Sequence, residues 1–332
     1  MAPAHPRLHV VTGKGGTGKS TVAAALALAL ASGGKKVLLC EAEGRQGIAQ
    51  LFDVAPLPYS EERIAVAPGG GDVFALAIDP EAALMEYLDL YYRLGRAGKA
   101  LDRFGVIDFA TTIAPGLRDV LLTGKIYEAA RRKTKTKAGK SKSKKQVYDA
   151  VVLDAPPTGR ITRFLNVNAE MAGLAKVGPV RNQADSIMSL LRSPQTAVHL
   201  VTVLEEMPVQ ETADGITDLA AAGLPVGSVV VNQVRRNGLD ARALSAAEAG
   251  DLPDAGIREG LKAAGLDTDE AVVTGLQELG SAHAARVLLE QQQRAVVDGL
   301  GRPVVELPTL AEGIDLGALY ELAQYLREGG LP

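Results

Sequence analysis

The segment GKGGTGKST at residues 13–21 constrains the fold of this chain more than any other feature. An apolar run at Leu8–Thr12 precedes it, and the apolar segment Val22–Ala31 follows it. This order matches the strand, Gly-rich loop and helix of the G-x-x-x-x-G-K-[ST] motif, whose backbone N–H groups surround a phosphate. Val22–Ala31 therefore indicates a buried helix, since it is too short for a membrane span and follows the loop directly.

The motif assigns a contact to each of its residues. Lys19 is expected at the β- and γ-phosphates, Ser20 on a Mg²⁺ ion and Thr21 on the α-phosphate side. The sequence thus predicts ATP or ADP with Mg²⁺ as the ligand. The residues expected to surround it are Gly13, Gly15, Gly16, Thr17, Gly18, Lys19, Ser20 and Thr21.

Apolar runs alternate with helical segments along the rest of the chain. Most of these runs are continuous, which is typical of strands in a parallel sheet that is covered on both faces. We therefore expect a single α/β domain over residues 1–332, with a doubly wound, mainly parallel sheet. The expected strands are Leu8–Thr12, Val37–Cys40, Val73–Ile78, Ala150–Leu153, His199–Leu204, Ser228–Asn232 and Pro303–Leu307.

Two long helical stretches interrupt this alternation. Residues 81–130 and 164–195 predict a helical subdomain inserted at the strand ends. Between them, residues 131–146 hold nine Lys and Arg and no acidic residue, whereas the whole chain has a net charge of −3. We expect this Lys-rich segment to be disordered.

Composition excludes several kinds of site. Cys40 is the single cysteine, so the chain cannot form a disulfide or a multi-cysteine zinc site, and we expect no zinc. An acidic body with one basic segment, no Trp and 4% aromatic residues does not resemble a nucleic-acid binder. A solvated loop is the favoured interpretation of the Lys-rich segment, with DNA binding as the weaker alternative.

A second nucleotide motif lies at residues 150–160, AVVLDAPPTGR. An apolar strand that ends in an acid has the form of a Walker B motif, in which Asp154 orients a Mg²⁺-bound water. A strand followed by Asp is weak evidence alone. The continuation through Leu165 is more specific.

Here the chain resembles the arsenite-pump and guided-entry (tail-anchored protein targeting) ATPases of the deviant Walker A group, and within them an actinobacterial anion-transporting branch. Residues 154–165 fit that family's D-T-A-P-T-G-H-x-x-R-F-L, and the resemblance runs from about Leu8 to Leu326. Further matches are 114–116 with Asp119 for P-G-x-x-E, and Gln210, Glu211 and Thr212 for a helix start. Asn232 and Gln233 match an adenine-reading pair, and Pro308, Thr309 and Leu310 match a loop that closes over the base.

The resemblance also implies roles for three further residues. Lys14, directly after the first glycine, would cross a dimer interface to the partner's phosphates and stabilise charge there. Residues 43–50 replace the family's D-P-A-H-x-L-S-D, which puts Glu43 at the metal and Gln50 where an aspartate orients the attacking water. Glutamine can position water but is not a base, so hydrolysis is expected to be slow or dependent on a partner.

Three functions follow from the resemblance. The first is an ATP-dependent dimeric carrier whose helical groove binds and targets hydrophobic, tail-anchored membrane proteins, with a membrane receptor or permease as a further partner. The others are the ATPase subunit of an anion pump, and a weakly hydrolysing scaffold that pairs with a paralogue in a heterodimer. We expect a cytoplasmic protein, with peripheral attachment to the inner membrane face as an alternative. The candidate groove residues, for which core packing is the alternative, are Leu84, Met85, Leu88, Tyr91, Ile187, Met188 and Leu191.

Overall fold

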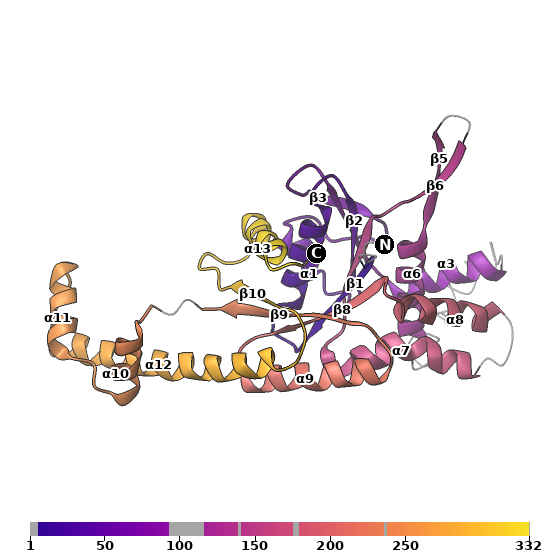
Figure 1. Ribbon diagram of the computed structural model, residues 1–332. Helices are drawn as coiled ribbons and strands as arrows, with labels where there is room; N and C mark the ends of the chain where they lie inside the picture. Colours follow the sequence, from indigo (N-terminus) through magenta and orange to yellow (C-terminus); the bar gives the residue numbers. More distant parts are fainter. Residues whose placement is uncertain (1–5, 93–115, 139–140, 175–178, 236–237, 332) are drawn as a thin grey trace.

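An eight-stranded sheet forms the centre of the molecule, in the order β10-β9-β8-β1-β7-β2-β4-β3. Every neighbouring pair is parallel except β3 and β4, which are antiparallel. The computed structural model describes residues 6–92, 116–138, 141–174, 179–235 and 238–331 (Figure 1). The strands are β1 (Leu8–Gly13), β2 (Lys36–Glu41), β3 (Glu62–Val66), β4 (Asp72–Ala77), β7 (Ala150–Asp154), β8 (Thr196–Thr202), β9 (Val226–Val234) and β10 (Val304–Pro308).

The predicted α/β fold with a mainly parallel sheet is confirmed. Strands β1, β7 and β8 are buried along their whole length, as expected for mainly apolar strands in the centre of a parallel sheet. The chain runs from β1 to β2 on one side of the sheet and reaches β8, β9 and β10 on the other side. Such a change of direction opens a crevice at the carboxyl ends of the central strands, which is where ligands bind in sheets of this kind.

Helices cover the sheet in two layers. On one face, α1 (Lys19–Ala31), α2 (Gly47–Leu51) and α13 (Leu316–Glu328) share a core with alternate strand residues. Residues Val22 to Ala31 of α1 are all buried, because the helix lies between the sheet and α13. The opposite core contains α6 (Leu117–Arg131), α7 (Thr158–Leu174), α8 (Pro179–Leu191) and α9 (Glu206–Ala221).

The helices of the two predicted stretches, α6, α7 and α8, are thus part of this second layer. Helix α3 (Pro80–Tyr92), which also belongs to them, packs against α6 (Figure 1). Of the candidate groove residues, Leu84, Ile187, Met188 and Leu191 are buried in the core, so they do not line a groove. Met85 packs partly buried beside the cluster of Leu84. The side chains of Leu88 and Tyr91 and all of residues 93–115 lie outside the described part of the chain, so a groove there stays a prediction.

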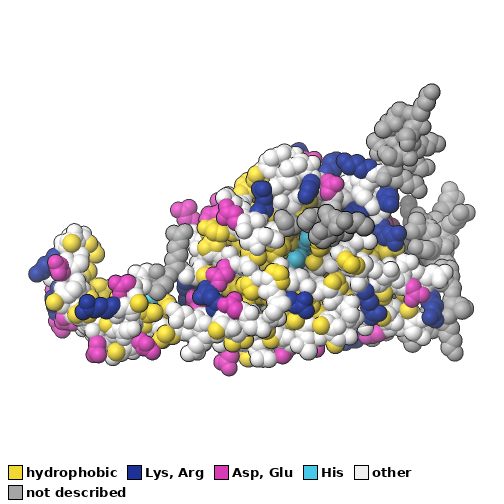
Figure 2. All heavy atoms as spheres, viewed as in Figure 1, with side chains coloured by type: hydrophobic (Ala, Val, Ile, Leu, Met, Phe, Trp, Pro, Cys, Tyr) yellow, Lys and Arg dark blue, Asp and Glu magenta, His cyan; other side chains and the backbone are white. Residues whose placement is uncertain are grey.

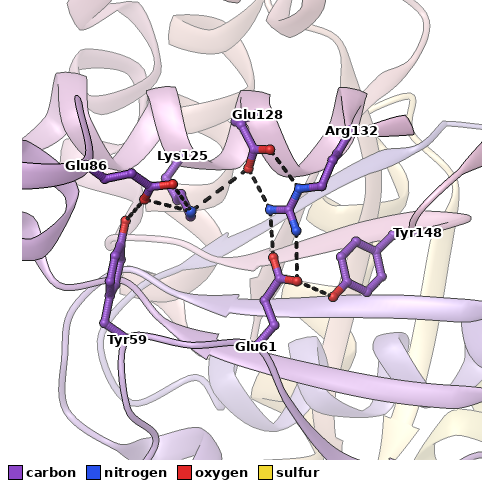
Figure 3. A network of polar contacts seen from close by, with 7 residues as sticks. All are labelled: Tyr59, Glu61, Glu86, Lys125, Glu128, Arg132 and Tyr148. Carbon is purple, nitrogen blue, oxygen red and sulfur yellow. Dashed lines mark hydrogen bonds and ion pairs between the residues drawn. The ribbon is translucent and has the colours of Figure 1, made fainter. Parts of the chain in front are cut away.

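A polar network ties α3 and α6 to the sheet (Figure 3). Arg132 lies 2.6 Å from a Glu128 oxygen and 2.8 Å from a Glu61 oxygen, and the Tyr148 hydroxyl donates to Glu61 at 2.6 Å. Beside it, Lys125 pairs with Glu86 at 2.8 Å. Because each buried or half-buried charge has an opposite partner, the network fixes the helical layer at little electrostatic cost.

The Lys-rich segment, for which we expected disorder, contains two strands. Strands β5 (Lys133–Ala138) and β6 (Ser141–Gln146) pair in an antiparallel hairpin, which projects from the body (Figure 1). The two strands pair through their backbone from Lys133↔Gln146 to Ala138↔Ser141, and backbone hydrogen bonds do not require apolar residues. The strand pairing is therefore a feature that composition alone did not indicate, and the predicted disorder of the segment in solution stays a prediction.

A second projection is formed by α10 (Ala241–Ala249), α11 (Asp254–Ala263) and α12 (Glu270–Asp298). The last turns of α12 reach the main core through Val297, whereas its first half extends beyond the body with α10 and α11 (Figure 1). Leu266 and Leu279 on this three-helix arm are 61% and 66% exposed, and apolar side chains are visible along it (Figure 2). No helix in the described ranges is both long enough and apolar enough to cross a bilayer.

Candidate nucleotide site

The phosphate loop joins β1 to α1 at the carboxyl edge of the sheet, next to β8 and β7. Gly16 and Gly18 adopt φ values of 90° and 84°, which other residues rarely adopt. A Cβ on Gly13 would lie 2.2 Å from the Val201 carbonyl oxygen, and one on Gly18 would lie 2.3 Å from the Asn232 amide. The loop can therefore take this shape only with glycine at these positions.

Internal hydrogen bonds hold the loop. The Thr17 hydroxyl donates to the Lys14 carbonyl at 2.8 Å, and the Thr17 N–H donates to the same oxygen at 3.3 Å. Helix α1 begins at Lys19 after Gly18, and no side chain caps its first turn. The free N–H groups and the partial positive charge of this helix end favour a phosphate.

Ser20 and Asp154 meet where β7 ends beside the start of α1. The Ser20 hydroxyl donates to Asp154 Oδ2 at 2.6 Å. Burial raises the pKa of Asp154 to about 6, and the negative charges of Glu41 and Glu43 add to this effect. Lys19 and the Ser20 hydrogen bond act in the opposite direction. The second oxygen, Oδ1, is buried and has no hydrogen-bond partner among the described residues.

Glu41 is a buried carboxylate that the sequence motifs do not reveal. It ends β2 and pairs in register with Asp154 on β7, and its side chain is 2% exposed. Its Oε1 accepts from the Gly47 N–H at 3.2 Å, while Oε2 has no partner in the described part of the chain. Glu41 could have been found from its position at the end of a strand, because the carboxyl ends of neighbouring parallel strands share one edge of the sheet.

Oxygen atoms at this edge fit a hard divalent cation. Two buried carboxylate oxygens without partners and one serine hydroxyl are ligands that Mg²⁺ prefers, directly or through its waters. Glu43, which we expected at the metal, lies 3.5 Å from Arg45. Its charge still contributes to the raised pKa of Asp154, so it belongs to the surroundings of the site.

The residues after β2 form a short loop and α2. Gln46 has a φ of 57°, and its side chain binds the backbone N–H and carbonyl of Leu57 at 2.7 and 3.2 Å. A Cβ on Gly47 would lie 4.0 Å from the Ser20 hydroxyl, so this loop reaches the metal-binding side. Gln50 is exposed on α2, and its side chain hydrogen-bonds to no other residue that the structure describes.

The predicted base-binding residues collect at the ends of β9 and β10. The Asn232 amide donates to the Thr17 carbonyl at 2.9 Å, which joins β9 to the phosphate loop. Gln233 has a φ of 59°, an uncommon conformation for a residue other than glycine. The Thr309 N–H donates to the Val234 carbonyl at 2.9 Å, so residues 308–310 lie beside the same pair.

Lys14 contacts helix α9. Its ammonium lies 2.8 Å from Glu211 Oε1, and the two side chains are 30% and 35% exposed. This ion pair could not be predicted from the sequence, because the two residues lie far apart in the chain. On the other side of the loop, the Thr12 hydroxyl donates to the Pro156 carbonyl at 2.7 Å and so joins β1 to the segment after Asp154.

Comparison with known proteins agrees with this geometry. A family model described as anion-transporting ATPase matches residues 7–194. The chain belongs to the anion-transporting ATPase family. It is 54% identical to the ATPase BagA of Mycobacterium tuberculosis over 325 residues. These residues cover 98% of this chain and 94% of BagA. The resemblance found in the sequence and the expected ATP hydrolysis are therefore confirmed.

More distant relatives have different names. The arsenical pump-driving ATPase of Escherichia coli is 30% identical over 240 residues, which cover 67% of this chain and 38% of that protein. The ATPase get3 of Schizosaccharomyces japonicus is 23% identical over 257 residues, or 68% of this chain and 73% of the relative. Both alignments reach beyond the span of the family model.

The single thiol of this anion-transporting ATPase is held in its protonated form by burial. Cys40 is fully buried in β2, and burial raises the pKa of its thiol to about 12. A thiolate, not a thiol, is the form that binds soft metals and metalloids. Within the described ranges, no three His, Cys, Asp or Glu side chains lie close enough together to hold a metal ion.

Proposed function

We propose that this ATPase is Mg²⁺-dependent, works as a cytoplasmic dimer and uses its nucleotide cycle to bind and release hydrophobic membrane-protein segments. The observation that carries the proposal is the assembly at the carboxyl edge of the sheet. There the phosphate loop, the Ser20–Asp154 contact and Asn232 come from three separate strands or their loops. Such an assembly can sense whether a γ-phosphate is present.

In the proposed site, residues 13–21 surround the phosphates, with Lys19 at the β- and γ-phosphates. Ser20 and Asp154 hold the Mg²⁺ ion, directly or through water, with Glu43 nearby. When bound, the ion offsets phosphate charge and orients the nucleotide. Asn232, Gln233 and residues 308–310 surround the base.

The dimer is proposed from Lys14. In the single chain its ammonium is paired with Glu211, and both side chains are partly exposed. An exposed ion pair contributes only about 0–1 kcal/mol, so a γ-phosphate of a second copy can replace Glu211 as the partner. Lys14 would then stabilise the charge that develops on the transferred phosphate.

Gln50 is proposed to position the attacking water after the dimer closes. Its exposed side chain has no other partner in the described residues, so it is free to take this role. Hydrolysis of ATP by a Gln50→Ala variant at the wild-type rate would remove Gln50 from the mechanism.

The client is proposed from the relatives and from the helical layer. One relative drives an arsenical pump by its printed name, but the buried thiol of Cys40 offers no metalloid ligand. The inserted helices α3, α6, α7 and α8 pack together beside the nucleotide edge. Four of the candidate groove residues are buried, so a hydrophobic segment is the favoured client only because the sequence resembles the tail-anchored protein targeting ATPases. A weakly hydrolysing scaffold that pairs with a paralogue is the second candidate, and the glutamine at position 50 favours it.

Client capture tests the first candidate. The chain would be co-expressed with a tagged tail-anchored membrane segment and purified in ATP or in ADP, with a Lys14→Ala variant as the control. We expect a detergent-free complex with the wild type that depends on the nucleotide and weakens in the variant. If neither nucleotide supports a complex although ATP still binds, the client proposal is wrong and a paralogue partner or permease should be sought.

A further inference from the structure

A pocket of about 310 Å³ lies at the amino edge of the sheet, opposite the nucleotide site. Arg7 precedes β1, Gln195 precedes β8 and Gln146 ends β6 before β7, so the pocket is formed where strands begin. This volume is at the lower end of the range for small-molecule sites. The lining residues are Arg7, Arg131, Lys133, Gln146, Ser189, Leu190, Ser193 and Gln195.

The lining carries three cations and no carboxylate. Neither Arg7, Arg131 nor Lys133 forms an ion pair with any acidic residue in the described part of the chain. Elsewhere in the molecule arginines and lysines are commonly paired, as Arg132 is directly beside this pocket. Three like charges that line one cavity repel one another, and a bound anion relieves this repulsion.

The arginine contacts orient the cations without neutralising them. Arg7 Nη2 donates to the Tyr148 carbonyl at 2.9 Å, and Arg131 Nη1 donates to the Tyr127 hydroxyl at 2.9 Å. Both partners are uncharged, and a guanidinium has further N–H groups to donate. Burial lowers the pKa of Arg7 from its ordinary value, because desolvation outweighs the attraction of Asp149. The positive charge is thus held without full compensation.

Neutral donors complete the lining. Ser189 is exposed on α8 and its hydroxyl forms no hydrogen bond with any residue that the structure describes, so the hydroxyl is free to donate. Gln195 is also exposed at the rim. Several N–H and O–H donors around three cations are the arrangement that proteins use for phosphate oxygens.

We propose that this pocket binds a small, multiply charged phosphate anion, at a site separate from the nucleotide. The anion can be soluble, such as a diphosphate, or it can be the headgroup of an anionic phospholipid. The pocket lies at the base of the β5–β6 hairpin, and Figure 2 shows Lys and Arg side chains on the surface in this region. A lipid surface would place further negative charge opposite those side chains.

The test uses the full chain saturated with Mg²⁺ and ADP, so that the phosphate loop is already occupied. Inorganic pyrophosphate is titrated in by calorimetry. The test variant is Arg131→Gln with Lys133→Gln, because both side chains are exposed and can be replaced without disturbing the core. The matched control is Lys35→Gln with Lys262→Gln, which removes the same charge from exposed positions elsewhere.

We expect the test variant to bind pyrophosphate at least about tenfold more weakly than the control, since it loses two charge-assisted contacts to the anion. A parallel assay measures sedimentation with vesicles of phosphatidylcholine alone and with added phosphatidylglycerol. Loss of binding in the test variant only on phosphatidylglycerol vesicles would assign the site to a headgroup. The proposal is overturned if neither probe binds, or if both variants bind each probe as the wild type does.

Discussion

The buried carboxylate of Asp154 suits the binding of a cation but lowers the stability of the folded chain when no cation is bound. Its carboxyl is buried with one oxygen unpartnered, and its pKa is raised to about 6. A carboxyl with a raised folded-state pKa loses stabilising free energy as the pH rises through the window from about 4 to 6. Above that window the charged form costs the folded chain about 3 kcal/mol when no cation is bound.

Replacing this carboxylate is therefore expected to stabilise the free protein. We predict that Asp154→Asn raises the unfolding temperature at pH 7.5 in a chelator, by several degrees, while ATP hydrolysis is lost. Differential scanning calorimetry measures the first and phosphate release the second. The exposed control, Asp251→Asn, should change neither. A lower unfolding temperature for Asp154→Asn would contradict the interpretation.

His9 and His199 form a buried pair whose proton positions follow from their neighbours. His9 Nε2 lies 3.1 Å from the Pro6 carbonyl, which can only accept, so Nε2 must carry the proton. His9 Nδ1 then accepts from His199 Nε2 at 3.1 Å, and His199 Nδ1 accepts from the Ser228 N–H at 3.2 Å. Both rings are therefore neutral, and each ring nitrogen has a hydrogen-bond partner. A further proton on either ring would have no acceptor for a hydrogen bond.

This pair predicts acid sensitivity. Burial lowers the pKa of His9 to about 4 and of His199 to about 3, whereas unfolded histidine has a pKa near 6.5. Below pH 6.5 the unfolded chain takes up protons that the folded chain does not. Each imidazole should therefore reduce the free energy of unfolding by about 1.4 kcal/mol per pH unit down to about pH 4.

Urea unfolding between pH 7.5 and 5 measures this slope. A His9→Gln variant should lose about half of it relative to the wild type, and a His283→Gln control should keep it. Comparison with the wild type at each pH removes the contribution of Asp154, which has the opposite sign. An unchanged slope in His9→Gln would show that the pair does not control acid stability.

At the scale of elements, the sequence predicted the strands that form a local run of mainly apolar residues. The central strands are continuous apolar runs, so β1, β2 and β7 were placed to within two residues. Strand β8 begins three residues earlier than expected, because the polar Thr196 is buried and its hydroxyl donates to the Leu190 carbonyl. Strand β3 was missed, since it is a mostly exposed edge strand without an apolar run.

The candidate site also contains residues that the sequence could locate and residues that it could not. The phosphate loop and Asp154 belong to motifs of fixed spacing, so they could be located from the sequence. Glu41 and the partner of Lys14 depend on which strand and helix lie next to each other, and this requires the strand order. The pocket at the opposite edge joins residues from four separate segments, and no spacing in the sequence indicates it.

The arm of α10, α11 and α12 should behave as a unit of low local stability. It has few buried side chains, among them Ala247, Leu261, Val273 and Ala284, whereas Val22 to Ala31 of α1 are all buried. Regions with little buried apolar surface open at lower free energy than the global transition. We predict that amides of residues 241–285 exchange with deuterium well before those of α1. Equal protection of the two regions would mean that the arm unfolds only with the whole domain.

At the scale of the whole molecule, we propose different roles for the two edges of the sheet. The carboxyl edge holds the nucleotide site and the Lys14–Glu211 ion pair, and the amino edge holds the basic pocket. If a second copy meets this one through the carboxyl edge, the amino edge of each copy stays outward. Breaking the ion pair would then be one contribution to the free energy of association.

Dimerisation with a nonhydrolysable ATP analogue tests this arrangement by sedimentation velocity. Glu211→Gln releases Lys14 and should strengthen the dimer by up to about thirtyfold, because two exposed pairs of about 0–1 kcal/mol each no longer need to break. Lys14→Ala removes the cation and should abolish nucleotide-dependent dimerisation. Glu206→Gln, at an exposed position on the same helix, is the control and should leave the dimer unchanged. A weaker dimer for Glu211→Gln would instead place Glu211 among the contacts of the closed interface.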